Sequence, residues 1–160
     1  MMRSRQIGQP RATALLAGVA ALVMTAGGGQ AAPDVGITAA VNRDAQGRIG
    51  SAAPRVITLG QAIIFNERIT TNASGLVQIL LVDGTTFTIG PGSELTIDEF
   101  VYDPNSGDAR VVATITKGAF RFIGGQSSRR PGGATVRTPA GTIGIRGAMV
   151  EGQVFGTSGI

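Results

Sequence analysis

The alternation of apolar and polar residues after Arg55 constrains the fold more than any other feature of this sequence. In "GLVQILLVDGTTFTIG" an apolar run from Leu76 to Val82 leads into Asp83-Gly84, and apolar residues then alternate with threonines. A period of two places successive side chains on opposite faces of the chain, as in a half-buried strand. Because Asp-Gly suits the positive φ values of a type I′ turn, the segment predicts a tight hairpin.

A second segment has the same spacing. "VQILLVDGTTFTI" and "VVATITKGAFRFI" start 34 residues apart, and both place glycine seven residues after the first valine. We expect strands on both sides of a turn at Lys117-Gly118, and a bulge near Asp98-Glu99, where the inward phase slips. No amphipathic helix pattern follows residue 31. The sequence therefore predicts an all-β fold of stacked short antiparallel hairpins, β-solenoid-like or sandwich-like.

The N-terminus has the three regions of an export signal. Arg3, Arg5 and Arg11 precede the apolar run Ala12 to Ala26, and small residues follow up to Ala31. The pattern predicts a signal peptide over residues 1–31, with a signal helix and cleavage after Ala31, and hence a periplasmic or secreted protein. An uncleaved membrane anchor is the alternative, although a spanning helix needs roughly 20 apolar residues and this run has 15.

The remaining chain divides by texture. Residues 32–54 combine scattered apolar residues with turn formers and predict a flexible lead-in, to which "VGITAAV" adds at most one strand. Residues 55–154 form the predicted β domain, and residues 155–160 a tail. Since no closing element follows, an exposed sheet edge leaves dimerisation or a further C-terminal part open.

The residue inventory excludes several chemistries. The chain has no histidine and no cysteine, so a serine-histidine-aspartate triad, a cysteine nucleophile and zinc sites built on these residues are excluded. Asp98 and Glu99 are the closest carboxylates, but neighbours on a strand point to opposite faces, which argues against a glycosidase pair. The sequence therefore predicts no enzyme, and no catalytic, cofactor-binding or metal-binding residues.

Two loops invite ligand interpretations. "DPNSGD" offers Asp103, Asn105 and Asp108 to calcium, but glycine at its fifth position breaks the EF-hand pattern and favours a plain turn. "GGQSSRRPGG" and "GIRG" are rich in glycine but lack the lysine-serine or lysine-threonine of a phosphate-binding loop and a following helix.

Charge is distributed unevenly along the chain. Residues 1–31 carry three of the 14 cations and none of the ten acids, so the formal charge falls from +4 to +1 without them. We therefore expect no nucleic-acid partner. Residues 69–109 hold six acids and no cation, whereas residues 110–150 hold seven cations and no acid. Either adjoining strands pair these charges, or a dipolar surface meets a charged partner through loop cations such as Arg129 and Arg130.

The segment "RTPAGTIGIRGAMV" carries the most specific pattern. It resembles the C-terminal signature of the FecR-like domain, named for the ferric-citrate regulator family, at Thr138-Pro139 and Arg146-Gly147; Ala148 stands where the family usually has threonine. "LVDGTTFTIGPGSELTI" and "ITKGAFRF" resemble the family's upstream motifs. The likeness covers roughly Arg55 to Val154.

The resemblance implies an extracytoplasmic, noncatalytic protein-interaction or signal-sensing module. Its partner would be a protein of the cell envelope, such as a receptor or a membrane regulator. Because about 11 residues precede the apolar run, we expect a standalone secreted member without the cytoplasmic segment that acts on a sigma factor. The alternative is an envelope-associated or surface-associated structural domain that contacts polysaccharide or larger assemblies. We expect the signature to be mainly structural, with a buried or half-buried acid of the acidic half as the candidate partner of Arg146, and keep ligand contact as the alternative.

Overall fold

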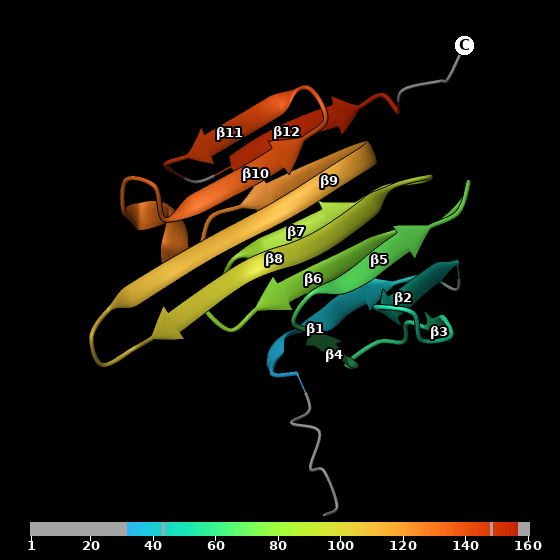
Figure 1. Ribbon diagram of the computed structural model, residues 1–160, viewed down its shortest axis with the longest axis horizontal. Helices are drawn as coiled ribbons and strands as arrows, with labels where there is room; N and C mark the ends of the chain where they lie inside the picture. Colours follow the sequence, from blue (N-terminus) through green and yellow to red (C-terminus); the bar gives the residue numbers. More distant parts are fainter. Residues whose placement is uncertain (1–31, 43, 148, 157–160) are drawn as a thin grey trace, which may run out of the picture. The chain divides into compact units, whose positions relative to one another are not determined.

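A computed structural model of the protein describes residues 32–42, 44–147 and 149–156, which belong to one compact unit (Figure 1). Apart from the short 3-10 helix η1, all its elements are strands, which confirms the all-β prediction. Among these residues no helix has the length and apolar character needed to cross a membrane; the expected signal helix lies outside them.

The elements are β1 (Asp34–Val41), β2 (Ala45–Ile49), β3 (Arg55–Val56), β4 (Ala62–Ile64), β5 (Glu67–Thr71), β6 (Val77–Leu81), β7 (Thr86–Ile89), β8 (Glu94–Asp103), β9 (Asp108–Ile123), η1 (Ser127–Arg129), β10 (Ala134–Thr138), β11 (Gly141–Ile145) and β12 (Met149–Val154).

Two layers share strand β9. The first layer runs in the order β3-β2-β5-β8-β9-β10-β11, and the second in the order β4-β1-β6-β7-β9-β12. In Figure 1 strands β8 and β5 lie in front of β7 and β6. Alternate side chains of both layers meet in a single core that includes Ile69, Leu95, Ile115, Phe87 and Phe122. The fold is therefore a curled sheet closed on an apolar interior, with sandwich-like layers.

Strand β9 crosses from one layer to the other at Gly118. Its first half pairs with β8 and β10, and its second half pairs with β7 and β12. Gly118 has a φ of 91°, a region that side chains with a Cβ rarely adopt. The buried positions change there from odd numbers, such as Ile115, to even numbers, such as Phe120. The expected turn at Lys117-Gly118 is therefore wrong, because this glycine bends a continuous strand of 16 residues.

The first predicted hairpin is confirmed, with a different turn. β6 and β7 pair antiparallel, and Gly84 has a φ of 83°, but Asp83 is not among the residues of positive φ. The main-chain N–H of Gly84 donates to the carbonyl of Leu81, and the N–H of Leu81 to the carbonyl of Thr85. These bonds define a three-residue loop, a type I turn followed by a left-handed glycine, in place of the predicted type I′ turn.

The predicted bulge in β8 is confirmed. Ile97 lies opposite Ala113 and Glu99 opposite Val112, so Asp98 is the extra residue.

One pairing departs from the expected antiparallel hairpins, since β10 runs parallel to β9. The β9–β10 connection makes this possible because it returns the chain through η1 before β10 starts.

The expected flexible lead-in over residues 32–54 contains two strands. β1 lies between β4 and β6, and β2 lies between β3 and β5. Both pairings of β1 are interrupted by register shifts, which break the alternation that a strand normally shows in sequence. A Cβ at Gly36 would lie 2.4 Å from the carbonyl oxygen of Leu80. Glycine here admits the neighbouring strand, a role that the sequence pattern does not reveal.

Candidate binding surface

Asp83 holds the loop after β9 against the β6–β7 turn. Its carboxylate is buried and accepts hydrogen bonds from the N–H and the hydroxyl of Thr85, at 2.9 and 2.8 Å. It also accepts bonds from the N–H of Ser127, at 3.0 Å, and from the Ser127 hydroxyl. The loop packs so closely that a Cβ at Gly125 would lie 2.2 Å from the nitrogen of Thr85. The Asp-Gly-Thr motif therefore fastens two loops together.

Glu67 is the second buried carboxylate. Arg55 grips it with two parallel hydrogen bonds of 2.8 Å, from Nε to Oε1 and from an Nη atom to Oε2. The N–H of Ile64 donates to the same carboxylate at 3.2 Å, and Arg55 also donates to the carbonyl of Ala62. This bidentate pair ties β3, β4 and β5 together at the end of the layers opposite the signature.

Ser93 secures the corner where β9 changes layer. Its hydroxyl donates to the carbonyl of Ala119 at 3.0 Å, and its N–H donates to the hydroxyl of Thr71 at 2.9 Å. A Cβ at Gly118 would lie 2.0 Å from the Ser93 hydroxyl oxygen. The serine of "PGSEL" and the glycine of "TKGAF" are thus matched parts of one corner.

The C-terminal signature forms an edge hairpin and the strand that follows it. β10 and β11 pair antiparallel around the Pro139-Ala140 turn, and the Thr138 hydroxyl donates to the carbonyl of Gly141 at 3.1 Å. β12 then pairs with the second half of β9. The hydroxyl of Thr138 thus has a structural role, because its hydrogen bond closes the turn of this hairpin.

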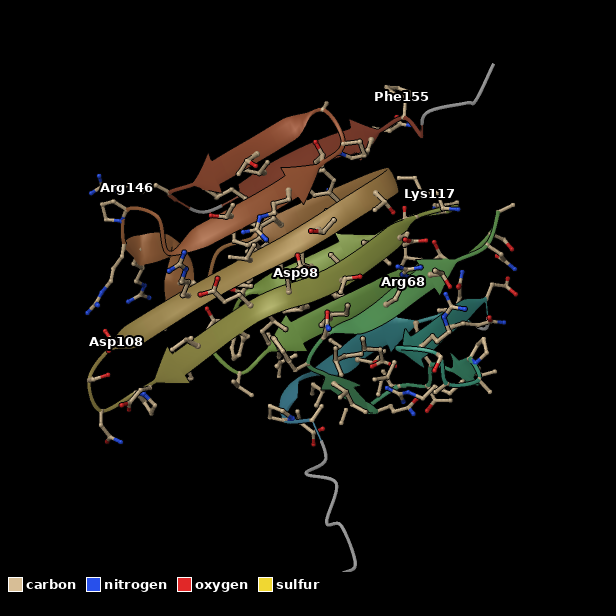
Figure 2. The ribbon with its side chains drawn as sticks, viewed as in Figure 1. Arg68, Asp98, Asp108, Lys117, Arg146 and Phe155 are labelled. Atoms are coloured by element: carbon tan, nitrogen blue, oxygen red, sulfur yellow. The ribbon has the colours of Figure 1, made fainter. Side chains whose placement is uncertain are left out.

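Arg146 lies between β11 and β12 and is exposed. Figure 2 places it at the opposite end of the β10–β12 region from Phe155. Within residues 32–42, 44–147 and 149–156 it makes no ion pair, so the expected bond to an acid is wrong. Its guanidinium is open to solvent and available for contact.

An apolar groove lies between the β10–β11 turn and β12. It has a volume of about 480 Å³, which falls in the usual range of ligand pockets. Its walls come from β9, β11 and β12 and from the residues around the turn, chiefly Phe120, Pro139, Ile143, Val150, Val154 and Phe155. This site was not predicted from the sequence, although Val150 and Val154, with Gly152 between them, share one face of the strand and signal an inward side.

Several charges of the acidic and basic halves pair as the sequence suggests. Arg110 lies 3.2 Å from Glu99, and Arg130 lies 3.2 Å from Asp108. The Arg110–Glu99 pair confirms the predicted pairing of charges between adjoining strands, since it joins β9 and β8. The Arg130–Asp108 pair joins a loop cation to β9. Arg129, the other cation of the loop, is exposed.

A row of arginines and threonines crosses the outer face of the first layer. Arg48 lies opposite Arg68, and successive register partners continue the row through Thr96, Thr114, Arg137 and Thr142. Figure 2 shows Arg68 on this face. Two like charges in register repel each other, and among the described residues Arg68 is compensated by a 3.5 Å contact with Glu94. The row also borders a carboxylate, since the Thr114 hydroxyl donates to Asp98 at 2.6 Å.

The "DPNSGD" segment is the β8–β9 turn. Asp103 accepts a hydrogen bond from the N–H of Asn105 at 2.8 Å. That bond, together with bonds from Ser106, lowers the pKa of Asp103. Asp108 is paired with Arg130. The part of the chain that the structure describes contains no cluster of three or more acids that could hold a metal ion.

The fold and the surface define an all-β domain whose motif residues fasten loops and whose groove offers a contact site. A family model described as FecR protein matches residues 67–159, and the chain belongs to this family. The match extends into the predicted tail. A solved structure titled "Cell surface anchoring domain" is 32% identical over 39% of this chain and 82% of that chain, with a TM-score of 0.37. No curated protein matched the chain.

Proposed function

We propose that the protein is an exported, noncatalytic interaction or sensing module of the FecR type, which binds another protein in the cell envelope. The observation that supports this proposal is that the polar residues of the family motifs make structural hydrogen bonds within the domain. The side chains of Asp83 and Ser93 form hydrogen bonds inside the domain, whereas an open apolar groove lies over the signature strands. A domain built in this way acts by binding a partner, because its potentially reactive side chains are engaged in structural hydrogen bonds.

Photocrosslinking in the producing cells tests this proposal. A photoreactive residue is placed either at Ile143 in the groove or at Val101 on β8, which are 40% and 47% exposed. We expect an adduct with an envelope protein from at least one position, and a mature N-terminus at Ala32 in the extracytoplasmic fraction. A chain that keeps Met1 in the cytosol, or yields no adduct from either position, would contradict the proposal.

The row of arginines supports a second candidate, an envelope domain that contacts an acidic polysaccharide. Arg68 and Arg137 are three register steps apart, or about 14 Å at the usual strand spacing. An anionic polymer laid across the layer would relieve the repulsion between Arg48 and Arg68.

Binding of polygalacturonate to the purified domain separates the two candidates. If the row binds the polymer, Arg137→Ala weakens binding several-fold and added salt weakens it further. Arg146→Ala serves as the matched control, because Arg146 is an exposed arginine outside the row. Equal losses in both variants, or no binding, would exclude the row as the site.

A further inference from the structure

We propose that the open edge of β12 and the adjoining groove accept one extended segment of another polypeptide, uncharged and with apolar side chains at alternate positions. This inference rests on the proposed function and names the surface and the kind of partner. It depends on three features of the structure: the hydrogen-bonding direction of β12, the unequal length of the two layers, and the chemistry of the groove.

The main chain of β12 has a free hydrogen-bonding side. Among the described strands, β12 pairs only with β9. The N–H of Gly90 donates to the carbonyl of Ala119, on the β7 side of β9. Because hydrogen-bonding directions alternate along an antiparallel strand, Phe120 turns its main-chain groups toward β12. Its register partner Gly152 points back toward β9, so Glu151 and Gln153 direct theirs to the open side.

The two layers are of unequal length at this end. Among the strands that the structure describes, the first layer has two beyond β9, β10 and β11, whereas the second layer has β12 alone. Ile143 is in register with the buried Val136, so its side chain faces inward, yet it is 40% exposed. The second layer therefore lacks one strand beneath β11, and the groove is that unfilled position.

The groove wall selects an uncharged segment. Its side chains are mostly apolar, and the charged lining residue, Glu151, already pairs with Arg121. Val150 and Val154 are half-buried on the inward face of β12, and Phe155, 79% exposed, stands at the end of the strand. Alternate apolar side chains of an added strand would cover these residues, while its polar side chains face solvent.

A second copy of the domain does not fit this edge. Antiparallel pairing of β12 with its counterpart would place a two-fold axis perpendicular to the sheet beside the strand. The β10–β11 hairpin of each copy would then occupy the space of the other, because the first layer has two described strands beyond β9 where the second layer has one. A single extended strand avoids the collision.

A tethered strand tests the proposal on the compact unit from Ala31 to Ile160. The probe is Thr-Val-Thr-Val-Thr-Val-Thr, joined after Ile160 by a flexible Gly/Ser linker of about 10 residues, and the control carries glutamate in place of valine. A short tether gives an effective concentration on the order of millimolar, so weak pairing is detected. We expect amide exchange at Glu151 and Gln153 to slow by at least about tenfold with the valine probe only.

Two matched pairs of variants identify the contact. Gln153→Pro removes an edge-facing N–H and abolishes the protection of Glu151, whereas Gln153→Ala keeps both. Ile143→Glu on the opposite wall also abolishes protection, whereas Val101→Glu on β8 leaves it unchanged. Protection that survives both Gln153→Pro and Ile143→Glu overturns the proposal, as does equal protection by the two probes. Protection lost in Ile143→Glu but kept in Gln153→Pro shows an apolar pocket without strand pairing, and overturns it too.

This result is separable from that of the proposed function. If the tethered probe gives no protection while photocrosslinking from Val101 captures an envelope protein, the domain binds its partner elsewhere and only the strand-docking proposal fails. If neither photocrosslinking position gives an adduct in cells, the proposed function fails, whatever the tethered probe shows.

Discussion

Replacing Arg55 with alanine is expected to lower the free energy of unfolding by about 3–5 kcal/mol, because it leaves a buried carboxylate without its counter-charge. Glu67 is fully buried, and Arg55 provides two of the hydrogen bonds to its oxygens. The pair joins β3 and β5, which sit at the end of the first layer. Chemical denaturation of the domain measures the loss.

An exposed ion pair provides the control for this prediction. Arg110 and Glu99 lie 3.2 Å apart, with side chains 56% and 40% exposed, so Arg110→Ala is expected to cost less than about 1 kcal/mol. The double variant Arg55→Met/Glu67→Leu removes both charges and is expected to recover most of the stability lost in Arg55→Ala. Equal losses in Arg55→Ala and Arg110→Ala would show that the buried pair is not a major source of stability.

Replacing Asp83 with alanine is expected to cost at least about 3 kcal/mol, because hydrogen bonds to a buried carboxylate contribute about 1.5–3 kcal/mol each. The change leaves the N–H groups of Thr85 and Ser127 without their acceptor inside the protein. We also expect the loop of residues 124–133 to become sensitive to protease, since Asp83 fastens it to the β6–β7 turn. Denaturation and limited proteolysis measure the two effects.

Asp103 is the matched control, because it is also a turn aspartate that accepts a main-chain hydrogen bond. It is exposed, so Asp103→Ala is expected to cost less than about 1 kcal/mol and to leave the loop after β9 protected. If Asp83→Ala were no more destabilising than Asp103→Ala, the conclusion that the Asp-Gly-Thr motif fastens two loops would be wrong.

Several residues of the family motifs stabilise the domain from within. Asp83, Ser93, Gly118 and Thr138 each satisfy a structural requirement within the domain. The exposed side chains around them, such as Phe155 and Arg146, carry no such requirement in the described residues. These motif residues therefore specify the scaffold, and the surface residues that they leave free are the candidates for contact with a partner.

The sequence pattern correctly predicted those features of the fold that depend on residues close together in the chain. The alternation around Asp83-Gly84 predicted the β6–β7 hairpin, and the phase slip predicted the bulge at Asp98. Residues 32–54 were expected to be flexible, with one strand over "VGITAAV" kept as a possibility, because register shifts in β1 remove the regular alternation while long-range pairing still holds the strand. Strand β2 was not predicted. The candidate acid partner of Arg146 is not found in the described residues, because charge counts along a chain do not show which charges meet.

The sequence by itself determined the all-β class, the family, and the absence of histidine and cysteine chemistry, since each depends on residue type or on a period of two. Only the tertiary structure decided that "VVATITKGAFRFI" is one bent strand, whereas the similarly spaced "VQILLVDGTTFTI" is a hairpin. Both segments place a glycine of positive φ at the same position. The partners alongside decide the outcome: β8 and β10 hold one half of β9 while β7 and β12 hold the other, and these pairings join residues far apart in the chain.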